Sequence, residues 1–134
     1  MVPAETQALE ILRDSVPGLL AVYRFGSMSS GTANPEIDVD LAILAHARLD
    51  GIARYELQER LASVLRRPVD LVDLRGASTV MAMQVVGAGT LLYDGDPAER
   101  GRFEDLAFSL YARLNEERRG ILDRIAREGT VYGR

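Results

Sequence analysis

The sequence has 134 residues, of which 47% are hydrophobic and 27% are charged, as in an ordinary globular domain with a buried core. Its net charge of −4 and pI near 5.0 argue against a surface that binds nucleic acid directly, and its lack of cysteine excludes disulfides and thiolate metal sites. No apolar run approaches the roughly 18 residues of a membrane span, and the N-terminus lacks a signal-peptide pattern, so we expect a cytoplasmic protein without a membrane partner.

The first third of the sequence predicts a helix, a buried strand and a polar loop. Apolar residues cluster on one side of a helix across residues 4–14, and residues 19–25 (LLAVYRF) form a short apolar run typical of a buried strand. Residues 26–35 are rich in Gly, Ser, Thr, Asn and Pro, which indicates a loop. A second strand is expected over residues 37–44, because its first half alternates apolar and acidic residues and its second half is continuously apolar.

The middle of the sequence predicts a helix followed by a third strand. Asp50 is a suitable N-cap for a helix over residues 51–65. Residues 69–74 (VDLVDL) follow Pro68 and have the length and composition of a strand. The helix is expected to bury an apolar face that consists of Ile52, Leu57, Leu61, Val64 and Leu65.

The last third predicts two further helices around a brief strand. An apolar helix is expected over residues 79–86, and a strand over residues 90–93. Pro97, preceded by Asp96, favours the start of a long helix that reaches about residue 127. Gly120 interrupts the pattern of that helix and can kink or break it.

These elements indicate a single α/β (α+β) domain over residues 1–134, with a mixed sheet of about four strands between flanking helices. The long C-terminal helix, at about residues 97–128, carries an apolar stripe beside a group of arginines. That stripe can pack on the domain itself or dock a partner protein, and the sequence favours neither. The stripe consists of Tyr111, Leu114, Ile121, Leu122 and Ile125.

Acidic residues on two predicted strands form a candidate metal site. Alternate residues of a strand share a face, so Asp38 and Asp40 are expected to point the same way. Two carboxylates side by side are unfavourable unless a cation or solvent screens them. The VDLVDL strand supplies a third acid, for which Asp70 and Asp73 are candidates on opposite faces. Clustered carboxylate oxygens suit Mg²⁺, and two such ions can serve an in-line phosphoryl displacement.

The pair Gly26-Ser27, directly after the first strand, is a candidate phosphate-binding turn. Glycine lets the backbone approach a phosphate closely, because no Cβ atom is in the way. The Ser27 hydroxyl and the amides that follow it can donate to phosphate oxygens. Strand, glycine-serine turn and a strand with two acids on one face therefore predict one site within a short segment.

Gly26-Ser27, ten further residues and Asp38-Val39-Asp40 resemble the signature of polymerase-β-like nucleotidyltransferases. The short chain is similar to the minimal nucleotidyltransferase (MNT) branch, and above all to MntA-type antitoxins, which are partners of HEPN-family toxins. That likeness covers nearly the whole chain, including the VDLVDL strand and the C-terminal segment SLYARLNEERRGILDRI.

The resemblance implies an antitoxin that transfers AMP from ATP to a tyrosine of a cognate HEPN-family (HepT-like) RNase toxin and releases pyrophosphate. It also implies a Mg²⁺ site with two ions. Gly26 and Ser27 would bind the nucleotide triphosphate. Asp38, Asp40 and Asp70 would be catalytic and hold the metal, with Asp70 preferred because it is centred in its strand while Asp73 ends it.

Two positions depart from the pattern of the minimal family. Ser30 stands where Arg or Lys is frequent, and Ile37 stands where Ser usually precedes the first acid. A cation lost near the phosphates would weaken nucleotide binding or slow transfer. A non-catalytic antitoxin that neutralises the toxin by complex formation therefore stays open. A separate alternative, which ranks lowest, is a nucleotidyltransferase that acts on a small molecule.

Overall fold

The structure, a computed structural model, describes residues 3–26 and 38–128. Every helix and strand predicted for this part of the chain is present, and each described end lies within two residues of its predicted position. The elements in chain order are α1 (Pro3–Ser15), β1 (Leu19–Phe25), β2 (Val39–Ala45), α2 (Gly51–Leu65), β3 (Val69–Asp73), the 3₁₀ turn η2 (Leu74–Gly76), α3 (Thr79–Ala88), β4 (Thr90–Asp94) and α4 (Pro97–Glu128).

The four strands form one mixed sheet in the order β3-β2-β1-β4, as the predicted fold class requires. β1 and β2 are the inner strands: β1 pairs antiparallel with both β2 and β4, whereas β2 and β3 run parallel. The parallel pair is connected by α2, in the crossover that such strands need. The C-terminal end of β1 therefore lies beside the N-terminal ends of β2 and β3.

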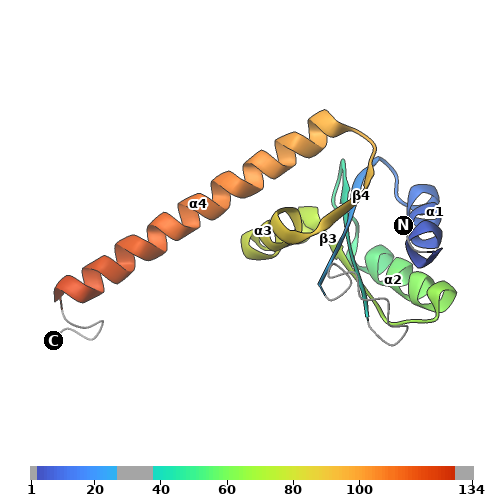
Figure 1. The fold of residues 1–134 in the computed structure, drawn as a ribbon, viewed down its shortest axis with the longest axis horizontal. Coiled ribbons are helices and arrows are strands. Elements are labelled where there is room, and N and C mark those ends of the chain that lie inside the picture. The colour runs from blue at the N-terminus through green and yellow to red at the C-terminus, as the bar shows by residue number, and fades with distance from the viewer. Residues whose placement is uncertain (1–2, 27–37, 129–134) are drawn as a thin grey trace.

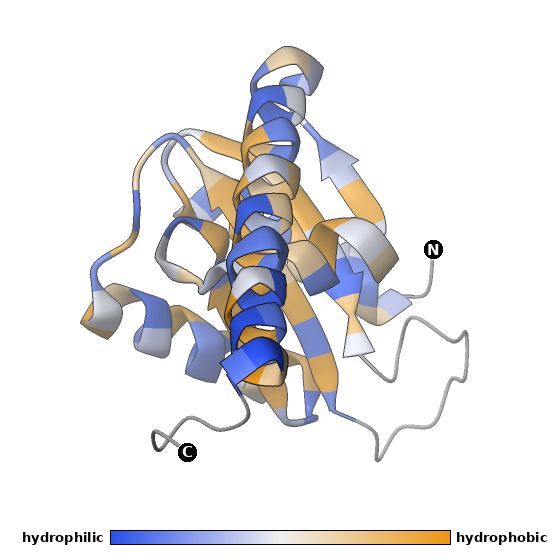
Figure 2. Ribbon diagram, turned by 90° about the vertical axis from the view of Figure 1, so that its left-hand side faces the viewer, coloured by the Kyte–Doolittle hydropathy of each residue, from blue (hydrophilic) through white to orange (hydrophobic). Residues whose placement is uncertain are grey.

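Helices cover both faces of this sheet (Figure 1). α1 and α2 pack on one face around a core that includes Leu12, Leu41 and Leu61, all fully buried. α3 and the beginning of α4 pack on the other face, around Leu44 and Val85. Figure 2 looks onto this second side and shows α4 crossing in front of the sheet, with polar and apolar residues intermixed along it.

The buried face of α2 is narrower than the sequence predicts. Leu57, Leu61 and Leu65 are buried, but Ile52 is 69% exposed and Val64 is 46% exposed. The three leucines lie four residues apart and define one line along the helix; Val64 lies at the edge of that line and Ile52 on the opposite side. The prediction that Ile52 and Val64 face inward is therefore wrong. Asp50 occupies the N-cap position, but its side chain makes no capping hydrogen bond.

α4 is a single helix of 32 residues that continues through Gly120 without a break. Asp96 caps it, because its Oδ1 accepts a hydrogen bond from the Glu99 amide at 3.2 Å. The second half of the helix extends well away from the rest of the chain (Figure 1). No helix in the described residues has the length and apolar content needed to cross a membrane.

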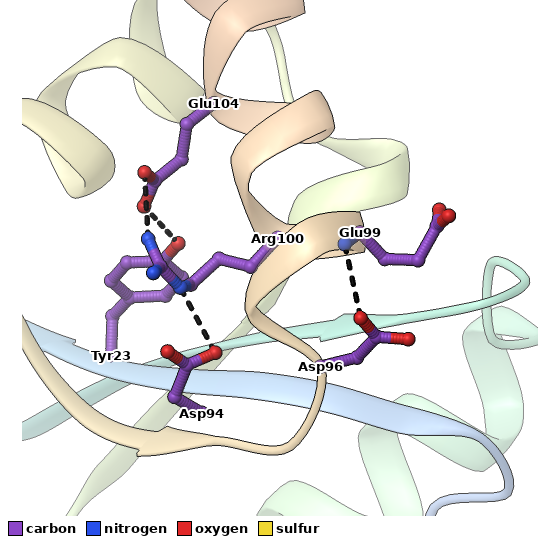
Figure 3. A network of polar contacts seen from close by, with 6 residues as sticks. All are labelled: Tyr23, Asp94, Asp96, Glu99, Arg100 and Glu104. Atoms are coloured by element: carbon purple, nitrogen blue, oxygen red, sulfur yellow. Dashed lines mark hydrogen bonds and ion pairs between the residues drawn. The ribbon is translucent and has the colours of Figure 1, made fainter.

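A polar network fixes the first turns of α4 to the sheet (Figure 3). The hydroxyl of buried Tyr23 on β1 donates to Glu104 Oε2 at 2.7 Å. Arg100 forms ion pairs with Asp94 at 3.0 Å and with Glu104 at 2.9 Å, and thereby joins β4 to α4. These contacts set the direction in which the long helix leaves the sheet.

Candidate active site

Gly26 lies directly against the carboxylate of Asp40. β1 and β2 pair so that Phe25 is opposite Asp40, which places the next residue, Gly26, over the acid. The backbone of Gly26 has a φ of +71°, and a Cβ atom built on it would lie 2.2 Å from Asp40 Oδ2. Only glycine fits both the conformation and the space. The glycine of the predicted phosphate turn and one predicted acid are therefore in contact.

Asp40 and Asp70 lie side by side on the same face of the sheet. They are register partners in the parallel pairing of β2 and β3, and paired residues point to the same side. Val39 and Leu41, which flank Asp40, belong to the core under α1 and α2. Asp40 and Asp70 therefore face the opposite side, the one covered by α3 and α4.

Asp38 completes the group electrostatically. It is exposed and immediately precedes β2, two residues before Asp40. Partial burial raises the pKa of Asp40 above its ordinary value, and the negative charges of Asp70 and Asp38 raise it further. The three acids thus act on one another, and a cation among them would relieve both the repulsion and the cost of burial.

The donor set fits Mg²⁺ in its chemistry, since carboxylate oxygens are the ligands that this hard cation prefers. Within residues 3–26 and 38–128, no three His, Cys, Asp or Glu side chains converge closely enough to hold a metal ion by themselves. Mg²⁺ usually keeps several waters and substrate phosphate oxygens, so one or two carboxylates can suffice as protein ligands. Asp40 and Asp70 would therefore suffice as protein ligands if substrate phosphate oxygens and water supplied the remaining ones.

Asp73 has a structural position on the other side of β3. It is 7% exposed, and its Oδ2 accepts from the Leu49 amide at 2.7 Å while its Oδ1 accepts from the Arg75 amide at 3.1 Å. Its carboxylate therefore caps η2 at the end of β3 and connects this turn to Leu49, in the segment before α2. Of the two acids in VDLVDL, Asp70 is the one beside Asp40.

Three residues of the sequence-based site lie outside the described part of the chain. Ser27, predicted to bind the triphosphate, falls there, and so do the two departures from the family pattern, Ser30 and Ile37. The described residues place Gly26 at the entrance to this segment and Asp38 at its exit.

A cavity of about 410 Å³ beside Asp70 was not anticipated from the sequence. Its volume lies within the range of small-molecule sites, roughly 300 to 1,000 Å³. Arg48 and Arg54 line it, and the Arg48 guanidinium lies against Gly76, where a Cβ atom would be 2.9 Å from Nε. Arg54 also donates to the Leu71 carbonyl at 3.0 Å, on the edge strand β3. These residues come from separate loops and helices, and no sequence spacing links them.

The chain is similar to known proteins over most of its length. Residues 7–98 match the family model for polymerase beta nucleotidyltransferases. The protein adenylyltransferase MntA of Shewanella oneidensis is 45% identical over 119 residues, which are 89% of this chain and 85% of the relative.

Two solved structures extend the comparison to complexes. A crystal structure of a toxin-antitoxin with AMP-PNP contains a chain that is 44% identical, with a TM-score of 0.81 over 91% of this chain and 98% of the other. A structure of the tri-AMPylated HEPN toxin of Shewanella oneidensis with its MNT antitoxin contains a chain that is 42% identical, with a TM-score of 0.77 over 92% of this chain and 96% of the other.

Proposed function

Because this chain belongs to the polymerase beta nucleotidyltransferase family, we propose that it is an antitoxin with protein adenylyltransferase activity. It transfers AMP from ATP to a tyrosine of a cognate HEPN-family RNase toxin and releases pyrophosphate. The observation that carries this proposal is the contact of Gly26 with Asp40 beside Asp70, in a chain 45% identical to a protein adenylyltransferase.

The proposed roles follow the order of the strands. Gly26 and Ser27, which follow β1, would bind the triphosphate, and Asp38, Asp40 and Asp70 would hold Mg²⁺. When bound, Mg²⁺ supplies positive charge that stabilises the attacking and leaving oxygens of phosphoryl transfer. Asp70 lies on β3, which β2 separates from β1 and Gly26. The acceptor hydroxyl would therefore enter beside Asp70, on the side away from the triphosphate, and Asp70 would take up its proton.

The reaction forms one bond and breaks one bond at the α-phosphorus of ATP. The tyrosine oxygen attacks that atom, the bond to the β-phosphate oxygen breaks, and pyrophosphate leaves with the displaced electron pair. The cavity beside Asp70, with Arg48 on its wall, is the proposed entrance for the acceptor side chain. Its use of ATP supports a cytoplasmic location.

The test is to incubate the chain with ATP labelled on the α-phosphate, Mg²⁺ and the cognate HEPN toxin. Label is expected on the toxin with the wild-type chain and not with Asp38→Ala plus Asp40→Ala. Glu10→Ala plus Asp14→Ala removes two exposed acids from α1 and serves as the matched control, which should label the toxin normally. An unlabelled toxin in the presence of a folded wild-type chain would overturn the proposal.

Rescue of cells from the toxin separates the alternatives. If the Asp38→Ala plus Asp40→Ala variant protects cells as well as the wild type does, binding alone neutralises the toxin and transfer is dispensable. If label appears only in low-molecular-weight material, the acceptor is a small molecule. Protection by the wild type and by the α1 control alone supports catalysis.

A further inference from the structure

The second half of α4 exposes a row of apolar side chains. Phe103 and Ala107, near its beginning, pack with α3 and the sheet. Farther along, Ile121 is 48% exposed and Leu122 is 63% exposed. This part of the helix extends beyond the other described elements (Figure 1). Large apolar side chains gathered in this way on a protein surface commonly mark an interaction site.

The exposed row continues the face by which α4 packs on the sheet. Phe103, Ala107, Leu114, Ile121 and Ile125 are separated by four, seven, seven and four residues, which places them on one side of a helix. Only the first part of this stripe has a partner among the described residues, in the core under α3. The remainder of this line and the neighbouring Leu122, about a quarter turn from Ile121, form what we call the distal stripe: Leu114, Ile121, Leu122 and Ile125.

All but the first two residues of α4 lie outside the part of the chain that matches the general nucleotidyltransferase family. The family model ends at residue 98, and α4 begins at Pro97. The alignment with MntA of Shewanella oneidensis spans 119 residues, so at least 21 of them lie beyond residue 98. The helix is thus an addition to the catalytic part that this chain shares with a protein adenylyltransferase.

The distal stripe and the acids lie on the same side of the sheet. α3 and α4 cover the face on which Asp40 and Asp70 lie, and the stripe is on the side of α4 that turns toward that face. A protein held along the stripe is therefore on the side from which a tyrosine can reach Asp70. An enzyme that modifies a folded protein needs such a surface in addition to its catalytic groups.

The geometry points to the distal stripe as the docking surface for the HEPN toxin that receives AMP. This inference rests on the proposed function and adds to it the means by which the substrate protein is held. An apolar row flanked by charged residues has the composition of an interface core with a polar rim. The flanking charges are Glu117, Arg118 and Arg124.

The test compares two pairs of substitutions on opposite sides of α4. Ile121→Asp plus Leu122→Asp places two charges on the distal stripe, at positions exposed enough that the helix should fold normally. Ser109→Asp plus Ala112→Asp places the same charges at exposed positions on the other side and is the matched control. The dissociation constant for the cognate HEPN toxin is measured by titration calorimetry, and AMP-PNP binding is measured in parallel.

The stripe variant is expected to bind the toxin at least tenfold more weakly, while the control stays within twofold and both bind AMP-PNP normally. Wild-type affinity of the stripe variant would overturn the inference and leave the proposed function intact. Conversion of a wild-type dimer to monomers by these substitutions, with toxin affinity unchanged, would assign the stripe to a second copy of the chain and also overturn it. If circular dichroism shows lost helix, Ile121→Ser plus Leu122→Ser is measured instead by the same criteria.

Loss of AMP transfer without loss of toxin binding would concern the catalytic acids and not the docking surface. The Asp38→Ala plus Asp40→Ala variant should bind the toxin with wild-type affinity and transfer nothing. Failure of the wild-type chain both to bind and to label the toxin would reject the proposed function, whereas normal labelling by the stripe variant at limiting toxin concentration would reject only the docking surface.

Discussion

A Cβ atom on Gly26 would lie 2.2 Å from Oδ2 of Asp40, so the residue that follows β1 is packed closely against the carboxylate on β2. A side chain at position 26 would collide with the Asp40 carboxylate where it now lies, so any larger residue must displace one of the two. A displacement of even about 1 Å in a catalytic group can reduce a rate by roughly 100-fold.

Gly26→Ala is therefore expected to reduce AMP transfer by about 100-fold or more, and to lower the free energy of unfolding by about 1–2 kcal/mol because φ at this position is +71°. Initial rates of toxin labelling and urea unfolding measure the two effects. Gly101→Ala, in α4 with no atom within 4 Å of the added Cβ, is the matched control and should keep its rate while gaining about 0.4–1 kcal/mol. A wild-type rate for Gly26→Ala would contradict the assigned site.

Asp70 and Asp73, three residues apart in one strand, should respond oppositely to substitution by alanine. Asp70→Ala is expected to reduce transfer by about 100-fold or more with little change in stability, because its exposed carboxylate has no structural hydrogen bond among the described residues. Asp73→Ala removes two hydrogen bonds to backbone amides and should cost about 2–3 kcal/mol in the free energy of unfolding. Thermal unfolding and initial rates distinguish them; a loss of activity for Asp73→Ala at full stability would reverse the assignment.

The acidic residues of the two strands show which features of the site the strand periodicity predicts and which it does not. The period of two in a strand fixes that Asp38 and Asp40 share a face and that Asp70 and Asp73 do not, and the structure has this arrangement for Asp40, Asp70 and Asp73. The lengths of the apolar segments likewise fix the elements themselves. What periodicity lacks is the pairing between strands, so the contact of Gly26 with Asp40 followed only from the register of β1 and β2.

Three features of the structure do not follow from local sequence patterns, for different reasons. Gly120 leaves α4 unbroken, because one glycine costs only about 1 kcal/mol in a helix of 32 residues. Ile52 is apolar but lies on the exposed side of α2, which local composition does not reveal. The network of Tyr23, Arg100 and Glu104 joins residues up to 81 positions apart, and no local pattern predicts it.

Substitution of Asp40 should reveal a conflict between stability and function. The pKa of Asp40 is raised in the folded state, so its contribution favours folding below the ordinary pKa of aspartate and is lost as the pH rises through the folded value. At pH 7 without Mg²⁺, Asp40→Asn is therefore expected to raise the free energy of unfolding by roughly 0.5–1 kcal/mol while abolishing transfer.

Urea unfolding with and without Mg²⁺ measures this effect. Addition of Mg²⁺ should stabilise the wild type more than the variant, because the metal binds the folded carboxylates. Asp14→Asn, on the exposed side of α1, should change stability by less than about 0.5 kcal/mol under either condition. A variant that is less stable than the wild type in the absence of metal would contradict the electrostatic account of the site.

The anchor of α4 predicts a sensitivity to alkaline pH. Burial of the Tyr23 phenol raises its pKa above the ordinary value, and its hydrogen bond to Glu104 raises it further. The stability that the phenol contributes is therefore complete below about pH 10, and it is lost as the pH rises toward the folded pKa. Tyr23→Phe should lower the free energy of unfolding by about 1 kcal/mol at pH 7, and this loss should shrink by about pH 11.

Urea unfolding across this pH range measures the difference between wild type and variant. Tyr55→Phe is the control, because its exposed hydroxyl also donates to a glutamate, Glu59, at 3.2 Å. A gap between wild type and Tyr23→Phe that stays constant from pH 7 to about pH 11 would show that the buried phenol does not titrate with folding.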